Sequence, residues 1–125
     1  LIAIDDQSVT IKIKLRRKSK NHLKSMYFGA LAVGADIAGG IHTFYYSEQS
    51  GDKISFSFKD MKADFLKRAE SDVTFISDGG DIIKSMLEKS KNTGDRQNDH
   101  VKVIAYNENK EVVAEFLMGV SLKVI

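Results

Sequence analysis

Residues 25–46, SMYFGALAVGADIAGGIHTFYY, form the most apolar stretch of the chain and decide the fold. After its first position only Asp36, His42 and Thr43 are clearly polar, and the residues do not alternate as those of a strand do. This length and composition are typical of a helix that is buried on nearly all sides. Its glycines each cost about 1 kcal/mol relative to alanine, which indicates that a sheet or a second helix packs closely against it. These glycines are Gly29, Gly34, Gly39 and Gly40.

The rest of the chain is rich in strand patterns, in which apolar and polar side chains alternate. We expect strands over residues 9–16, 54–65, 73–75, 101–106 and 111–125. A short helix is predicted over residues 81–91 with Asp81 as its cap, followed by a loop over residues 92–98. A sheet with one apolar face buries it most simply by curling around the apolar helix. The sequence therefore predicts an α+β fold with an antiparallel sheet wrapped around one long central helix.

Length and composition exclude several classes of function. A chain of 125 residues fits a single domain, which we place over residues 1–125. It has no cysteine, which excludes disulfides, thiol nucleophiles and cysteine-based zinc sites. The net charge of +2 is the small difference between 19 basic and 17 acidic residues, so we expect neither nucleic acid nor a membrane as a partner. The sequence contains no recognisable secretory leader, which favours the cytoplasm.

A resemblance to a known family rests on the residues that begin the helix. The run Asn21-His22-x-x-Ser25-Met26-Tyr27-Phe28-Gly29-Ala30-Leu31-Ala32, followed by Asp36 in a glycine-rich helix, resembles the thioesterase branch of the hot-dog superfamily. Many members of that branch carry only a domain-of-unknown-function label. The resemblance implies a hot-dog fold, an acyl-CoA or acyl-carrier-protein thioester as substrate, and a homodimer or a dimer of dimers with active sites between subunits. It implies no cofactor apart from coenzyme A as part of the substrate.

Asp36 is the sharpest candidate for a catalytic residue. A lone carboxylate in an apolar helix must be paired, hydrogen-bonded or directed at a cavity, because burying it alone costs several kcal/mol. In the phenylacetyl-CoA type of hot-dog thioesterase a helix Asp stands seven residues after a glycine, and Gly29 and Asp36 have that spacing. The resemblance therefore implies that Asp36 is a general base or a nucleophile. The alternative is a structural Asp that caps or bridges a dimer interface.

The residues ahead of Asp36 complete the implied catalytic set. Backbone N–H groups in the first turn of a helix lack partners, so Phe28 and Gly29 could hold the oxyanion of a thioester carbonyl. Gly29 could equally serve close packing against the sheet. Asn21 and His22 belong to the same signature and either orient substrate or cap the helix. Tyr27-Phe28 replaces the His-Gly that precedes this glycine in the phenylacetyl-CoA type, so the carbonyl contact is expected to differ.

Basic and aromatic residues provide candidate substrate contacts. The basic run contains Arg16, Arg17 and Lys18, which either cradle the phosphates of coenzyme A or form a solvated strand end. A second basic stretch, with Lys59, Lys62, Lys67 and Arg68, could serve the same purpose. The remaining candidates are expected either in the core or along an acyl tunnel. They are Phe56, Phe58 and Met61.

Other classes of function are less well supported by the sequence. The three histidines are scattered without a metal-ligand motif, so no metal site is expected; we interpret His42 as a core or interface residue and His100 as a solvated loop residue. The main alternative to an enzyme is a non-catalytic acyl-CoA or lipid-binding protein that uses the same cavity. A membrane span over residues 26–46 is opposed by Asp36 at its centre and by its glycines.

Overall fold

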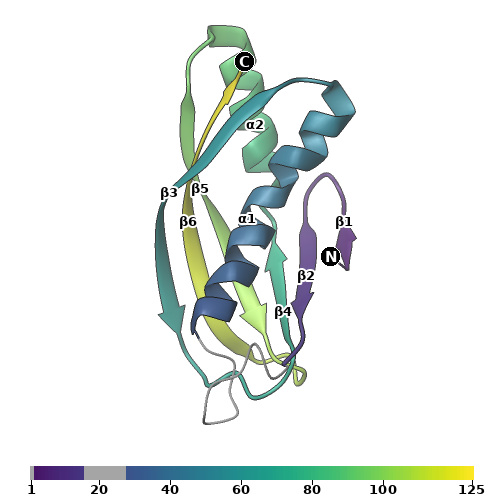
Figure 1. Cartoon of the computed structure of the whole chain (residues 1–125), viewed down its shortest axis with the longest axis vertical. Coiled ribbons are helices and arrows are strands. Elements are labelled where there is room, and N and C mark those ends of the chain that lie inside the picture. Colours follow the sequence, from purple (N-terminus) through teal and green to yellow (C-terminus); the bar gives the residue numbers. More distant parts are fainter. Residues whose placement is uncertain (1, 16–27) are drawn as a thin grey trace.

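The computed structural model describes residues 2–15 and 28–125. The elements, in chain order, are β1 (Ala3–Ile4), β2 (Val9–Ile13), α1 (Phe28–Ser50), β3 (Ile54–Phe65), β4 (Val73–Ser77), α2 (Gly80–Thr93), β5 (Gln97–Tyr106) and β6 (Val112–Val124). The strands form one antiparallel sheet in the order β1-β2-β4-β5-β6-β3. Figure 1 shows α1 lying across one face of this sheet, with α2 beside its C-terminal half. The predicted α+β arrangement, a sheet around one long helix, is confirmed.

Glycines allow α1 to approach the sheet closely. A Cβ on Gly34 would lie 2.3 Å from the ring of Phe75 on β4, and one on Gly39 would lie 3.2 Å from Met118 on β6. Ala35 and Ala38 beside them are fully buried. The close packing expected from the glycines is confirmed at Gly34, Gly39 and Gly40, whose neighbours are large side chains of the sheet, whereas Gly29 is exposed.

Alternation along the strands separates an inner face from an outer face. The buried row of β6 contains Ala114, Phe116, Met118, Val120 and Leu122, as the sequence predicts. On β3 the alternation shifts between Phe58 and Met61, because the register with β6 changes between Phe58 and Asp60. This β-bulge keeps both Phe58 and Met61 on the inner face, opposite Val120 and Met118 respectively.

Several predicted boundaries are wrong. The helix predicted to end at Tyr46 continues to Ser50, and the strand predicted over residues 9–16 ends at Ile13. The predicted loop over residues 92–98 gives way at Gln97 to β5, which makes His100 an exposed strand residue rather than a loop residue. The short strand β1 was not expected, because it has only two residues to alternate.

The second helix starts one residue earlier than predicted and has a different cap. Its N-cap is Gly79, without a side-chain hydrogen bond, so the prediction that Asp81 caps it is wrong. Asp81 lies in the first turn, where its negative charge is favourable to the helix dipole. The helix ends at Gly94, whose φ of 76° is the left-handed conformation that glycine adopts readily.

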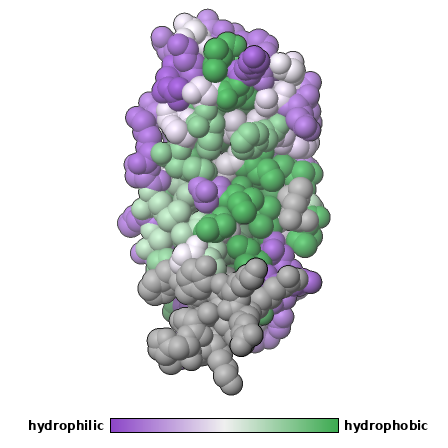
Figure 2. All heavy atoms as spheres, in the orientation of Figure 1, coloured by the Kyte–Doolittle hydropathy of each residue, from purple (hydrophilic) through white to green (hydrophobic). Residues whose placement is uncertain are grey.

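The prediction that α1 is buried on nearly all sides is also wrong. Val33, Ile37 and Phe44 expose 54%, 43% and 67% of their surface, and Asp36 among them is exposed. Figure 2 shows this face of the molecule, where hydrophobic side chains gather around α1 between hydrophilic margins. The composition of the helix could not reveal this exposure, because an apolar helix face that is exposed contains the same residue types as an apolar face that is buried. Among the described residues, no helix is both long and apolar enough to cross a membrane.

Candidate functional site

Asp36 lies in the middle of the exposed face of α1. Residues three, four or seven apart share one face of a helix, so Gly29, Val33 and Gly40 lie on the same side as Asp36. Ile37 follows Val33 by four residues and borders this side. Val33 and Ile37 flank the carboxylate with exposed apolar surface. The carboxylate therefore stands within an open apolar surface and is not enclosed in the core.

An aromatic pair on β3 adjoins this face one turn beyond Asp36. A Cβ on Gly40 would lie 3.0 Å from the ring of Phe58 and 3.3 Å from that of Phe56. The two rings pack edge to face with centroids 5.1 Å apart, and both are only partly buried. Gly40 follows Asp36 by four residues, about 6 Å along the helix axis. The structure thus brings Phe56 and Phe58 to the neighbourhood of the Asp36 turn.

Met61 continues the same apolar row towards the other end of β3. It lies on the inner face opposite Met118 and exposes 40% of its surface. Phe65, further along, also exposes 40% of its surface and packs edge to face against Phe116. The inner face of β3 is therefore the least covered part of the apolar sheet surface.

Gly29 and Asp36 share a face but are separated along the helix. Seven residues correspond to about 10 Å of axial rise. A backbone N–H and a carboxylate that act on one thioester carbonyl must both lie about 3 Å from the reacting atoms. The two groups of one chain are therefore too far apart to act together on one carbonyl.

Some of the other predicted site residues lie outside the described part of the chain, and the rest lie away from Asp36. Arg16, Arg17, Lys18, Asn21 and His22 lie outside the described residues, as does the side chain of Phe28. In the second basic stretch, Lys67 pairs with Glu111 and Arg68 lies 3.8 Å from Glu70. Lys62 is opposite Leu117 on the outer face of the sheet, away from Asp36.

His42 is a core residue, as predicted. It exposes 1% of its surface, and its Nε2 lies 3.0 Å from the backbone carbonyl of Asp5, to which Nε2–H donates. The hydroxyls of Tyr45 and Tyr46 donate to the carboxylate and the backbone carbonyl of Asp6. The hydrogen bond to Asp6 raises the pKa of Tyr45. These contacts attach the β1–β2 turn to the second half of α1.

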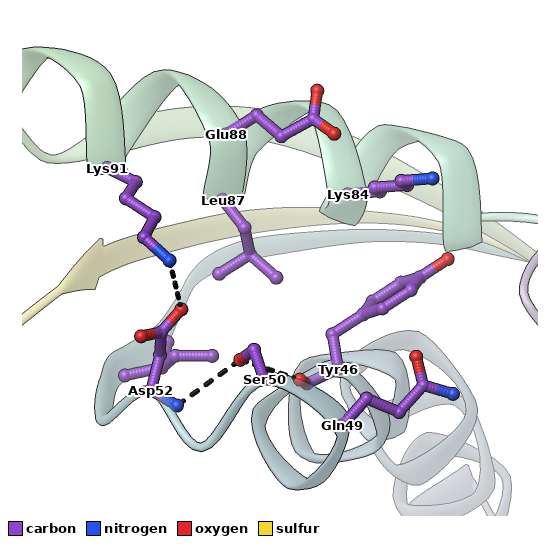
Figure 3. A pocket seen from close by; sticks show the side chains of 9 residues that line it. Tyr46, Gln49, Ser50, Asp52, Lys84, Leu87, Glu88 and Lys91 are labelled. Atoms are coloured by element: carbon purple, nitrogen blue, oxygen red, sulfur yellow. Dashed lines mark hydrogen bonds and ion pairs between the residues drawn. The ribbon is translucent and has the colours of Figure 1, made fainter.

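A hollow of about 260 Å³ lies between the end of α1 and α2. Figure 3 shows Leu87 pointing from α2 towards the end of α1, with the Tyr46 ring on one side and Asp52 on the other. Tyr46 follows Asp36 by ten residues, about 15 Å along the helix. None of the residues that line this hollow was predicted as a site residue, and the hollow is separate from the Asp36 face.

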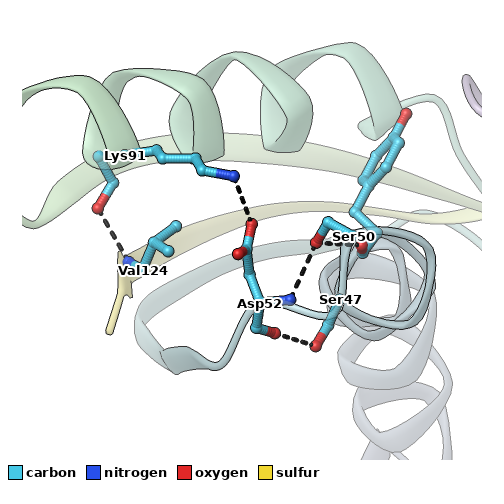
Figure 4. Close-up of polar contacts among 7 residues, drawn as sticks. Ser47, Ser50, Asp52, Lys91 and Val124 are labelled. Carbon is cyan, nitrogen blue, oxygen red and sulfur yellow. Dashed lines mark hydrogen bonds and ion pairs between the residues drawn. The ribbon is translucent and has the colours of Figure 1, made fainter.

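Polar contacts close the end of α1 beside this hollow (Figure 4). Lys91 Nζ lies 3.2 Å from Asp52 Oδ2, and the Ser47 hydroxyl donates to the Asp52 carbonyl at 2.7 Å. Ser90 of α2 is buried, and its hydroxyl accepts the backbone N–H of Val124 at 2.9 Å. The network joins both helices to the last strand and has a structural purpose.

The sequence reasoning missed the exposed apolar stripe that surrounds Asp36. Its members are Val33, Ile37 and Phe44, which the sequence places in a helix that is buried on nearly all sides. The spacing was a usable signal, because Val33 and Phe44 stand three and eight residues from Asp36 and Ile37 stands four residues from Val33, and such intervals share one face of a helix. Among the described residues, no group of three or more histidine and acidic residues is arranged to hold a metal ion.

Solved structures resemble this chain over nearly its whole length. Protein PA5026 from Pseudomonas aeruginosa, a protein of unknown function described as a probable thioesterase, has a TM-score of 0.83 at 23% identity; the match covers 99% of this chain and 81% of that one. Protein OLEI01261 from Chlorobaculum tepidum, of unknown function, has a TM-score of 0.84 at 9% identity, over 98% and 80% of the two chains. Thioesterase HI1161 from Haemophilus influenzae has a TM-score of 0.73 at 12% identity, over 98% and 76%.

The structural likeness establishes the fold, which is the hot-dog fold that the sequence predicts. No curated protein sequence matches the chain. The model of the family described as a domain of unknown function, DUF4442, matches residues 2–122. The chain therefore belongs to DUF4442, a family described as a domain of unknown function.

Proposed function

We propose that this protein hydrolyses an acyl thioester, with acyl-CoA as the substrate class and Asp36 as the general base or nucleophile. The observation that carries the proposal is the position of Asp36, a carboxylate at the centre of an exposed apolar surface on α1. Hydrophobic neighbours suit an acyl group, and a carboxylate beside it suits attack on the carbonyl. Similarity in fold to proteins described as thioesterases supports the choice of reaction.

The reaction needs few groups. As a general base, Asp36 removes a proton from a water molecule while that water attacks the thioester carbonyl. As a nucleophile, the Asp36 carboxylate attacks the carbonyl and forms an anhydride, which water then hydrolyses. In both cases the C–S bond breaks, the thiol leaves with a proton and the acyl group is released as a carboxylate. A backbone N–H in the first turn of α1, at Phe28 or Gly29, stabilises the oxyanion that forms in between.

The separation of Gly29 and Asp36 supports a site made by two copies of the chain. If two α1 helices pack antiparallel across a two-fold axis, the first turn of one approaches the middle of the other. The oxyanion donor and the carboxylate of one site then come from different subunits. A homodimer is therefore part of the proposal, and a dimer of dimers is compatible with it.

The free edge of the sheet supports the same assembly. In the described part of the chain, β3 has twelve residues and no neighbour on its outer side, whereas the opposite edge is the two-residue β1. A long unpaired edge beside exposed apolar surface favours pairing with another strand. Antiparallel pairing of β3 with its copy about Met61 would place Asp60 opposite Lys62 of the second copy, so opposite charges meet twice across the axis.

The remaining candidates bind the substrate in this proposal. Phe56 and Phe58 contact the acyl chain, because they border the Asp36 face and are partly exposed, and Met61 extends this contact along the inner face of β3. Arg16, Arg17 and Lys18 contact the phosphates of coenzyme A, and Asn21 and His22 orient the thioester. No cofactor is needed beyond the coenzyme A of the substrate. Since coenzyme A thioesters are made inside cells, the proposed location is the cytoplasm.

Thiol release from acyl-CoAs of short, medium, long and aromatic acyl groups tests this function. We expect turnover of at least one class, and a loss of about 10²–10⁴-fold in kcat for Asp36→Asn, which keeps the shape and removes the base. Glu48→Gln is the matched control, because Glu48 is an exposed carboxylate on the same helix. Equal activity of Asp36→Asn and the parent protein would refute the role of Asp36. Binding of acyl-CoA without turnover by either protein would instead establish a non-catalytic acyl-binding protein.

A further inference from the structure

The outer face of the sheet, opposite α1, carries a groove of its own. Two hollows of about 510 and 250 Å³ share Ile76 and Tyr106 as lining residues and so form one continuous depression. Ile76 and Ile104 are paired in register between β4 and β5, and they alternate with the buried residues Phe75 and Val103. The groove is thus separated from Asp36 by the thickness of the sheet.

The floor of the groove is apolar and elongated. Ile76, Ile104 and Tyr106 form its centre, and Ile82 from the first turn of α2 extends it at one end. All four side chains are partly buried. From Lys102 to Tyr106 the floor follows about 13 Å of β5. This shape suits an extended apolar chain better than a compact ring system.

Cationic groups stand at both ends of this floor. Lys12 and Lys110 line the larger hollow and Lys102 lines the smaller one. No carboxylate in the described ranges pairs with Lys102 or Lys110, whereas Lys12 lies 3.6 Å from Asp72. Lys110 has a φ of 60°, a left-handed conformation that is rare outside glycine.

The charge balance indicates what kind of anion fits. Asp78 and Glu108 also line the groove, and Asp72 pairs with Lys12, so three carboxylates balance the three lysines. This balance favours a single negative group, which Lys110 can pair with, over a polyphosphate, which would meet repulsion from the carboxylates. The larger hollow offers two lysines and the hydroxyl of Thr74 for that group.

We propose that this outer groove, defined by Lys12, Ile76, Ile104, Tyr106 and Lys110, binds a long-chain monocarboxylate, with the carboxylate between Lys12 and Lys110 and the chain along Ile76 and Ile104. The volume of about 510 Å³ in the larger hollow lies in the ordinary range of small-ligand pockets. The inference does not rest on the proposed hydrolysis, because none of the five residues belongs to the Asp36 face.

The test is a titration of the ¹⁵N-labelled full chain with dodecanoate below its micellar concentration, followed by amide chemical shifts. We expect saturable shifts centred on β4, β5 and the 107–111 turn. Lys110→Gln should weaken binding about five-fold, as expected for one exposed charge contact, and Lys84→Gln on α2 should not. Ile76→Thr should also weaken the binding of dodecanoate, and it keeps a β-branched residue in the strand.

Three results would overturn the proposal. Shifts confined to α1 and β3 would place the chain on the Asp36 face instead. Binding that is equally tight for Lys110→Gln and the parent protein, or dodecanol binding as tightly as dodecanoate, would remove the carboxylate site. A fall in molecular mass for Ile76→Thr would show that a second copy covers the groove. Asp36→Asn should bind dodecanoate unchanged, so loss of hydrolysis and loss of this site are distinguishable.

Discussion

Gly34 and Gly40 lie on different sides of α1, and the aromatic rings next to them differ in burial. Gly34 faces Phe75, which is fully buried between the helix and the sheet. Gly40 faces Phe58 and Phe56, whose rings are partly exposed at the edge of the sheet. A methyl group at either position brings the same gain in helix propensity. The two substitutions therefore differ only in whether the neighbouring aromatic rings can move away from the new methyl group.

We expect Gly34→Ala to lower the free energy of unfolding by about 1–3 kcal/mol, because the buried Phe75 ring cannot move away from the new methyl group without straining the core. Gly40→Ala should change it by less than about 1 kcal/mol, since the exposed rings can shift and helix propensity improves by a similar amount. Urea unfolding of both variants measures the difference. Equal destabilisation by the two would contradict this reading of the helix–sheet contact.

At the scale of elements, α2 is held by a polar contact to the last strand. Ser90→Ala should lower the free energy of unfolding by about 1–3 kcal/mol, because the N–H of Val124 loses the hydroxyl that accepts it. Ser85 is exposed on the same helix, so Ser85→Ala is the control and should be close to neutral. Thermal unfolding compares the two variants, and an unperturbed Ser90→Ala would show that water replaces the hydroxyl.

The β1–β2 turn contributes a pH-dependent element of stability. The backbone N–H groups of Ser8 and Gln7 donate to Asp5 Oδ1 at 2.8 and 2.9 Å, and they hold the pKa of Asp5 below its usual value. A carboxylate with a lowered pKa in the folded state stabilises that state above the unfolded pKa of about 4. The contribution is lost as the pH falls through the folded-state pKa.

We therefore expect Asp5→Ala to be less stable than the parent protein at pH 7, and the difference between them to shrink as the pH falls below about 4. Urea unfolding at a series of pH values measures this. Asp99→Ala is the control. The Asp99 carboxylate also accepts a backbone N–H, that of His100, but this hydrogen bond does not close a turn. A difference between Asp5→Ala and the parent that is independent of pH would rule out the charged form of Asp5 as its source.

At the scale of the whole molecule, the open α1–β3 surface is the feature that a single chain leaves unexplained. A monomer with exposed Val33, Ile37, Phe44 and Met61 beside a free strand edge has much apolar area to cover. The proposed homodimer covers it and brings the first turn of α1 to the Asp36 of a second copy.

Met61→Lys should therefore lower the solution mass from dimer to monomer, because two lysines would meet at the two-fold axis. Leu117→Lys is the matched control on the outer face of the neighbouring strand, with a side chain that is 41% exposed. Light scattering coupled to size exclusion measures both masses. A fall in mass for Leu117→Lys alone would place the interface on the outer face of the sheet.

Much of the fold could be read from local patterns. Alternation in β6 follows directly from the pleat, and the length and glycine content of residues 25–46 are enough to predict a helix against a sheet. The boundaries of the elements were harder to predict. Gln97 begins a strand only because β6 is long enough to pair with it. The bulge near Asp60 shifts the alternation of β3, and this shift depends on the pairing with β6.

The amino-acid sequence alone determined the class of fold and the buried faces of the strands, because these depend on periodicity. It also singled out Asp36 as a candidate, since Asp36 is the one carboxylate within the apolar run of residues 25–46. Only the tertiary structure decided which side of α1 stays open, because that depends on how far a sheet of this width reaches around the helix. It also decided that Phe56 and Phe58 border the Asp36 face and that the Ile76–Tyr106 groove lies behind it, since both depend on strand order and register between segments distant in the chain.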